Sequence, residues 1–215
     1  MTPVKAIVFD FNGTLSDDEP VLCEIFRNLF AERGRPLSAQ EYYDELAGLS
    51  DPEIVLTWLG RDFPDVDAVV AQRVLRYRDA VSDGSTVYRH VREAVRYAAD
   101  RVPLAICSGA ARSEIEPVVA SAGLAPLLRG IVSSDDVAEG KPHPEGYLAA
   151  LELLGGDVRP GEVLAIDDTE AGVASAKAAG LLTFAKTGTL DPHRLAHADE
   201  LIDRIDVELM RRVLG

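Results

Sequence analysis

Short runs of apolar residues alternate with amphipathic segments along most of the chain, and this alternation predicts the fold class. Five apolar runs occur, at residues 4–9, 104–107, 131–132, 163–166 and 181–185. Continuous runs of this length fit strands that are buried on both faces, as in a parallel sheet. The segments between them carry apolar positions at helical spacing, for example Val91, Val95 and Ala98. Alternating strands and helices predict an α/β fold with a doubly wound parallel sheet.

Residues 16–81 interrupt this alternation, because they show helical patterns only. Two segments in this stretch, which begin at Ser38 and Ser50, match the capping box that starts many helices. An insert of this length after the first strand is far longer than an ordinary connection between a strand and a helix. We therefore expect a helical cap domain at residues 16–81, lying over a Rossmann-like core formed by residues 1–15 and 82–215.

Composition and charge narrow the class of protein. The chain has 215 residues, with 36 acidic and 22 basic side chains and a net charge of −14. This acidic excess argues against a nucleic-acid binder and against a protein of anionic membrane surfaces. The first apolar run is too short for a signal peptide or a membrane span, and two cysteines provide neither a disulfide framework nor a four-cysteine zinc site. We expect a soluble cytoplasmic protein, present as a monomer or a dimer.

Polar residues follow three of the predicted strands at the point where each strand ends. Asp10 follows the first run, Ser108 the second, and Asp167 and Asp168 the fourth. The carboxyl ends of parallel strands meet at one edge of a sheet, so these side chains are expected to line one crevice. Two adjacent buried acids require a compensating cation, and Mg²⁺ prefers such ligands together with a substrate phosphate. Lys141, held between turn-forming neighbours, can neutralise phosphoryl charge.

Four segments, taken in order, resemble the motifs of the haloacid dehalogenase (HAD) superfamily of phosphotransferases. They are residues 10–15 (DFNGTL), 108–109 (SG), 141–144 (KPHP) and 167–173 (DDTEAGV). The resemblance extends from residue 4 to about residue 184. Residues 16–107 between the first two motifs suit the inserted helical cap of the phosphatase and β-phosphoglucomutase-like branch.

The resemblance implies a magnesium-dependent phosphomonoester hydrolase that acts on a small metabolite, such as a sugar phosphate or a phosphoglycolate-like compound. Asp10 would attack the phosphorus atom and form an aspartyl-phosphate. The groups that would bind the phosphoryl group are Ser108, the Gly109 amide and Lys141. The oxygen atoms that would hold Mg²⁺ come from Asp10, the backbone carbonyl of Asn12, Asp168 and Asp167. The catalytic set is then Asp10, Asn12, Ser108 and Lys141.

Asn12 departs from the sequence pattern of the branch that this chain resembles. Phosphatases and mutases of the family carry an aspartate there, which protonates the leaving oxygen and then deprotonates the attacking water. An amide can do neither, and the loss of a general acid–base group typically lowers the rate by about 10²–10⁴-fold. Two alternatives follow. The chain is a phosphatase that relies on another base or on a substrate with a good leaving group, or it is a catalytically attenuated binder of a phosphorylated ligand.

Three other branches of the family fit the residues less well. A phosphonatase needs a lysine in the cap, and no lysine lies between Lys5 and Lys141. A haloacid dehalogenase needs no metal, whereas the pair Asp167 and Asp168 favours a cation. A bisphosphate-handling mutase would carry an arginine where Asp51 stands, and an acid at that position would repel a second phosphate.

Overall fold

The computed structural model describes residues 3–156 and 158–215 and contains a twisted parallel sheet at its centre. In the described residues the sheet has six strands, in the order β3-β2-β1-β4-β5-β6, and every neighbouring pair is parallel. The strands are β1 Ala6–Phe9, β2 Leu104–Cys107, β3 Gly130–Val132, β4 Val163–Asp167, β5 Leu182–Lys186 and β6 Glu200–Ile202. The predicted α/β fold class is thus confirmed, and the five predicted strands are all present.

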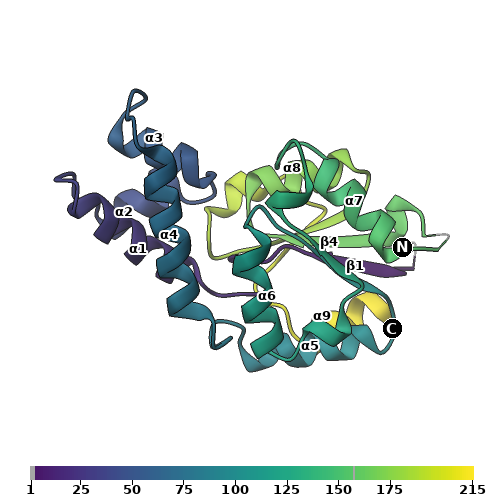
Figure 1. Cartoon of the computed structure of the whole chain (residues 1–215). Coiled ribbons are helices and arrows are strands. Elements are labelled where there is room, and N and C mark those ends of the chain that lie inside the picture. Colours follow the sequence, from purple (N-terminus) through teal and green to yellow (C-terminus); the bar gives the residue numbers. More distant parts are fainter. Residues whose placement is uncertain (1–2, 157) are drawn as a thin grey trace.

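Helices cover both faces of the sheet, as a doubly wound fold requires (Figure 1). They are α5 Arg89–Ala99, α6 Arg112–Ser121, α7 Glu145–Leu154, α8 Glu170–Ala178 and α9 Val207–Leu214. Side chains alternate between the faces along β1: Ile7 and Phe9 enter one apolar cluster, and Ala6 and Val8 enter the other. In the described residues, no helix is both long and apolar enough to cross a membrane.

A second group of helices lies to one side of the sheet and connects β1 to the rest of the core (Figure 1). It comprises α1 Glu19–Ala31, α2 Ala39–Glu41, a π-helical turn at Tyr42–Leu46, α3 Asp51–Leu59 and α4 Val66–Val81. At the start of α2, the Glu41 N–H donates to the Ser38 hydroxyl at 3.2 Å and the Ser38 N–H donates to the Glu41 carboxylate at 2.8 Å. At the start of α3, the Glu53 carboxylate accepts the Ser50 N–H at 2.9 Å. The helical interpretation of this stretch agrees with the structure.

Candidate active site

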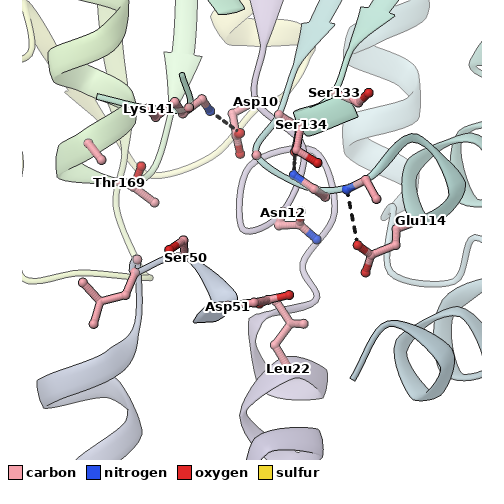
Figure 2. A pocket seen from close by; sticks show the side chains of 18 of the residues that line it. Asp10, Asn12, Leu22, Ser50, Asp51, Glu114, Ser133, Ser134, Lys141 and Thr169 are labelled. Carbon is pink, nitrogen blue, oxygen red and sulfur yellow. Dashed lines mark hydrogen bonds and ion pairs between the residues drawn. The ribbon is translucent and has the colours of Figure 1, made fainter. Parts of the chain in front are cut away.

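The residues singled out at the strand ends lie together at one edge of the sheet. Asp10 follows β1, Ser108 follows β2, and Asp168 follows β4. They line a cavity of about 520 Å³ whose walls also include residues from α1, α3 and α4 (Figure 2). Further predicted residues line the same cavity: Asn12, Gly109 and Lys141. Asp167 is fully buried directly behind this wall.

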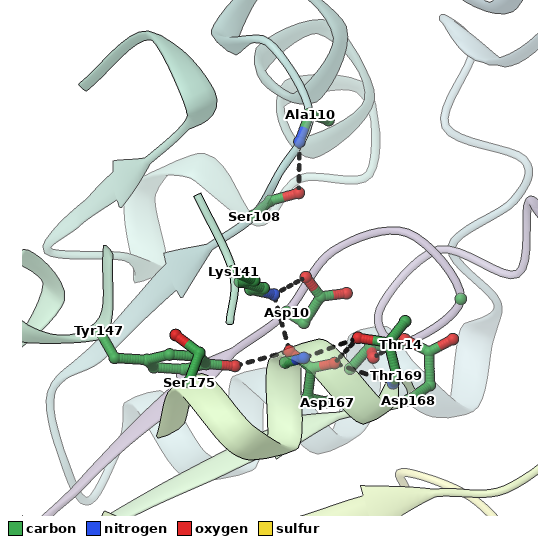
Figure 3. Close-up of polar contacts among 12 residues, drawn as sticks. Asp10, Thr14, Ser108, Ala110, Lys141, Tyr147, Asp167, Asp168, Thr169 and Ser175 are labelled. Carbon is green, nitrogen blue, oxygen red and sulfur yellow. Dashed lines mark hydrogen bonds and ion pairs between the residues drawn. The ribbon is translucent and has the colours of Figure 1, made fainter. Parts of the chain in front are cut away.

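Lys141 joins two of the aspartates by a shared ion pair (Figure 3). Its Nζ lies 2.5 Å from Asp10 Oδ1 and 2.7 Å from Asp167 Oδ2. Burial alone would lower the pKa of Lys141, but the charges of Asp10 and Asp167 outweigh it and raise that pKa above its usual value. Lys141 therefore remains a cation that can meet a phosphoryl oxygen beside Asp10.

Asp167 is held as an anion by an extensive set of hydrogen bonds. Its Oδ2 accepts the Tyr147 hydroxyl at 2.7 Å, and its Oδ1 accepts the Thr169 N–H and hydroxyl at 2.9 and 2.8 Å. Burial acts to raise the pKa of Asp167, but Lys141 and these donors outweigh it and lower that pKa. A side chain at Gly172 would place its Cβ 2.0 Å from the Asp167 carboxylate, so glycine is required there.

Among residues 3–156 and 158–215, one buried carboxylate oxygen of Asp168 has no hydrogen-bond partner. Asp168 Oδ1 accepts the Thr14 hydroxyl at 2.8 Å, whereas the buried Oδ2 is the oxygen without a partner. Burial, reinforced by the charge of Asp167, raises the pKa of Asp168 to about 7. An orphaned buried oxygen of this kind calls for a compensating group.

The three aspartates fit a divalent cation. Asp10, Asp167 and Asp168 each offer an oxygen atom, and these atoms lie within 4.8 Å of one another. Burial raises the pKa of Asp10 well above its usual value, and the two neighbouring aspartates add to that rise while Lys141 opposes it. A hard cation takes carboxylate and carbonyl oxygens as ligands and favours the ionised carboxylates. The donor set therefore suits Mg²⁺.

Asn12 lies beside Asp10 on the loop that follows β1, but its side-chain amide group is bonded to the helical insert. Its Nδ2 donates to Asp18 Oδ2 at 2.9 Å and to the Tyr77 hydroxyl at 3.0 Å. Neither partner was predicted from the sequence, because neither belongs to a motif and Tyr77 lies 65 residues away in the chain. Lys186, also missed, donates to the Gly13 carbonyl at 2.8 Å and supports the same loop.

The part of the cavity contributed by α3, α4 and α6 contains a buried cluster of charged side chains. Arg73 of α4 contacts Glu114 of α6, and its Nε lies 3.3 Å from Asp51 Oδ2. All three residues line the cavity, and Arg73 is only 5% exposed. Asp51 stands out in the sequence only as an acid at a position where a bisphosphate-handling mutase would carry an arginine, and nothing in the sequence points to Arg73 or Glu114.

Comparison with known proteins assigns the chain to a family. The model of the haloacid dehalogenase-like hydrolases matches residues 4–180, and the chain belongs to this family. The chain is 30% identical over 204 residues to validoxylamine A 7'-phosphate phosphatase of Streptomyces hygroscopicus subsp. limoneus, and the match covers 92% of each protein. It is 32% identical to protein CbbY of Rhodobacter capsulatus, with 83% of each covered.

A solved structure shares the fold over almost the entire chain. A mutant of CbbY from Rhodobacter sphaeroides in complex with xylulose-1,5-bisphosphate superposes with a TM-score of 0.81 and 26% identity, covering 96% of both chains. The expected family is thus confirmed, and with it the conclusion that the chain is a hydrolytic enzyme with phosphatase-like relatives.

Proposed function

We propose that the chain is a Mg²⁺-dependent phosphomonoester hydrolase that acts on a small phosphorylated metabolite. The observation that carries this proposal is the buried cluster of Asp10, Lys141, Asp167 and Asp168 at one wall of the cavity. It combines a carboxylate nucleophile, a buried cation and a set of oxygen ligands, which phosphoryl transfer requires. The relatives named as phosphatases support the same conclusion.

Asp10 is the proposed nucleophile. Lys141 holds its Oδ1, so the other carboxylate oxygen is available to attack phosphorus. The new oxygen–phosphorus bond replaces the bond to the ester oxygen, which leaves with the bonding electron pair and takes a proton from solvent water to become the alcohol. Water then attacks the aspartyl-phosphate, and the products are inorganic phosphate and the regenerated Asp10 carboxylate. Ser108, the Gly109 amide and Lys141 would hold the phosphoryl oxygens during both steps.

The cofactor and the cap complete the proposal. The ligands that would hold Mg²⁺ are Asp10, Asp168 and the backbone carbonyl of Asn12, with Asp167 supporting them. When bound, the ion would neutralise negative charge on the phosphoryl oxygens. Residues 16–81 would form the cap domain, which covers the reacting group and provides the far wall of the cavity.

The charged residues in the part of the cavity away from Asp10 favour a substrate with one phosphate over a bisphosphate. A mutant of the similar protein CbbY is bound to a bisphosphate. In this chain, Asp51 of α3 and Glu114 of the core helix α6 line the cavity opposite Asp10, and Arg73 is already paired with both. A second phosphate on the substrate would lie close to the carboxylates of Asp51 and Glu114, and these negative charges would repel it. We therefore propose monophosphates with a neutral or polyhydroxylated leaving group.

Aryl phosphates are expected to be hydrolysed at least about 10²-fold faster than alkyl phosphates of similar size, because Asn12 cannot protonate the departing oxygen. Phosphate release from p-nitrophenyl phosphate, sugar monophosphates, sugar bisphosphates and phosphoglycolate, each with Mg²⁺, tests both the function and this ratio. Failure of the chain and of an Asn12→Asp variant to release phosphate from any of them would contradict the proposed function.

A second candidate function is favoured by Asn12 alone. A chain that lacks the acid–base group could bind a phosphorylated ligand with Mg²⁺ and release it unchanged, as a sensor does. Calorimetric titration of a sugar monophosphate, paired with a turnover assay under the same conditions, separates the two functions. Tight binding with negligible turnover supports the sensor, and rapid turnover excludes it.

Mg²⁺ is expected to stabilise the fold, and more strongly at higher pH. The pKa of Asp168 is about 7 in the folded chain against an ordinary 3.8, so the folded chain binds more protons between these values. Without metal, stability therefore falls as pH rises through this range, and a bound cation removes that loss. At a Mg²⁺ concentration of about 100 times Kd the total gain is about 2.7 kcal/mol.

Melting temperatures with EDTA or with MgCl₂, at about pH 6 and about pH 8, measure this effect. The Mg²⁺-dependent increase should be larger at the higher pH. An increase that is the same at both values, or no increase at all, would show that Asp168 is not a ligand of the ion.

A further inference from the structure

The side-chain amide of Asn12 is held by a buried pair of residues from two helices of the insert. Asp18 precedes α1 and Tyr77 lies on α4, and both side chains are 0% exposed. Asn12 Nδ2 donates to Asp18 Oδ2 at 2.9 Å and to the Tyr77 hydroxyl at 3.0 Å. The Tyr77 hydroxyl in turn donates to the same Asp18 oxygen. The three groups form a closed triangle of hydrogen bonds.

The donors and acceptors in this triangle fix the orientation of the amide. A carboxylate only accepts, and Asp18 Oδ1 is already occupied by the Gly13 N–H at 3.0 Å. The single Tyr77 hydrogen is used on Asp18, so the hydroxyl oxygen can only accept from Asn12. The NH₂ group of Asn12 must therefore face the pair. Its Oδ1 has no hydrogen-bond partner in the described residues, and Asn12 lines the cavity beside Asp10 (Figure 2).

Asp18 does not have the simpler role that its position would suggest. It occupies the N-cap position of α1, yet its side chain makes no capping hydrogen bond to that helix. Its carboxylate instead accepts hydrogen bonds from the Gly13 N–H and the Asn12 amide of the β1 loop. The Asp18 carboxylate is thus used to hold the loop that carries the proposed nucleophile, not to cap the helix.

Tyr77 is itself fixed by a charged frame that links the insert to the core. The Arg73 guanidinium lies 5.0 Å from the centre of the Tyr77 ring, and Arg73 contacts Glu114 of α6. Both Arg73 and Glu114 are at most 5% exposed. The hydroxyl of Tyr77 therefore has little freedom to move away from Asn12, and the triangle is held from the side of α4 as well as from α1.

We propose that Asp18 and Tyr77 are positioning residues that require an amide at position 12 and turn its Oδ1 toward the reacting phosphate. A carboxylate at position 12 would set acceptor against acceptor at Asp18 Oδ2, with no hydrogen atom between them. Position 12 then serves as a fixed acceptor, which orients the attacking water without taking its proton. This proposal rests on the proposed phosphatase function, because it assigns the roles around that reaction.

A reciprocal exchange of the two side chains tests the proposal. In the double variant Asn12→Asp with Asp18→Asn, the new amide can donate to the new carboxylate and still accept the Gly13 N–H. The other carboxylate oxygen at position 12 would face the cavity as a general base. Hydrolysis of an alkyl phosphate with Mg²⁺ should show a kcat about 10²-fold or more above that of Asn12→Asp alone. KM should differ little, because the phosphate contacts are unchanged.

The matched control is Asp206→Asn, which replaces the N-cap aspartate of α9 away from the cavity. It should leave both kcat and KM at the level of the unaltered chain. The proposal is overturned if Asn12→Asp alone reaches the kcat of the double variant, because Asp18 would then not require an amide at position 12.

A double-mutant cycle based on melting temperatures distinguishes failure of this proposal from failure of the proposed function. If none of the proteins releases phosphate, the melting temperatures of the unaltered chain, both single variants and the double variant still report on the contact. Each single change should lower the melting temperature, and the double variant should recover most of the loss. If the decrease in melting temperature of the double variant equals the sum of the decreases of the two single variants, the proposed contact between positions 12 and 18 is overturned, whatever the activity.

Discussion

Replacement of Asp10 by asparagine is expected to lower kcat for phosphate release by at least about 10⁴-fold while leaving the fold intact. The amide keeps the size of the carboxylate and can still accept from Lys141, but it cannot form an acyl phosphate. Stability should not fall, since burial and two neighbouring aspartates already raise the pKa of Asp10 and disfavour its charge. Steady-state kinetics and a thermal melt of the purified variant measure both effects.

Asp62→Asn is a suitable control for this change. Asp62 is exposed in the turn between α3 and α4, so its replacement should alter neither activity nor stability. An Asp10→Asn variant that kept a tenth or more of the activity, on the order of a 1.4 kcal/mol change in barrier, would show that Asp10 is not the nucleophile.

Replacement of Lys141 by methionine is expected to destabilise the chain by about 3–5 kcal/mol and to lower kcat by about 10²–10³-fold. Lys141 is the cation that lies between Asp10 and Asp167, and its side chain is only 13% exposed. Its loss leaves buried carboxylates without a partner and removes a positive charge from the phosphoryl site. Urea denaturation and steady-state kinetics, both in the absence and in the presence of Mg²⁺, measure the two losses.

Lys177→Met is the matched control, because Lys177 forms an ion pair with Asp199 at the surface. Exposed pairs contribute at most about 1 kcal/mol, and Lys177 is remote from the cavity lining. A Lys141→Met variant as stable as Lys177→Met would contradict the assigned role of the buried ion pair.

Much of the fold could be predicted from the sequence, because buried parallel strands leave a strong local signal. Strands β1 and β2 are apolar throughout, β4 is apolar up to its last residue Asp167, and polar residues at their ends mark the edge of the sheet where the site lies. Strand β6 left no such signal. It is a short strand at the sheet edge in which only Ile202 is buried, so its pairing with β5 depends on tertiary packing.

The candidate site was predictable in its core and unpredictable in its surroundings. Asp10, Lys141 and Asp168 each stand in a motif at a strand or loop end, and the structure brings them together. Tyr77 of α4 belongs to none of the motifs. That its hydroxyl would reach Asn12, and that Arg73 would reach Glu114, depends on how α4 packs against the core, which no local pattern encodes.

The central claim is that Asp10 becomes phosphorylated during turnover, and acid quenching followed by peptide mass mapping tests it most directly. The chain would be mixed with p-nitrophenyl phosphate and Mg²⁺ and quenched in acid, which preserves an acyl phosphate long enough for digestion at low pH. We predict the added mass of one phosphoryl group on the peptide that contains Asp10, and none in the Asp10→Asn variant. Turnover accompanied by a phosphoryl group on another residue, or on none, would contradict the account.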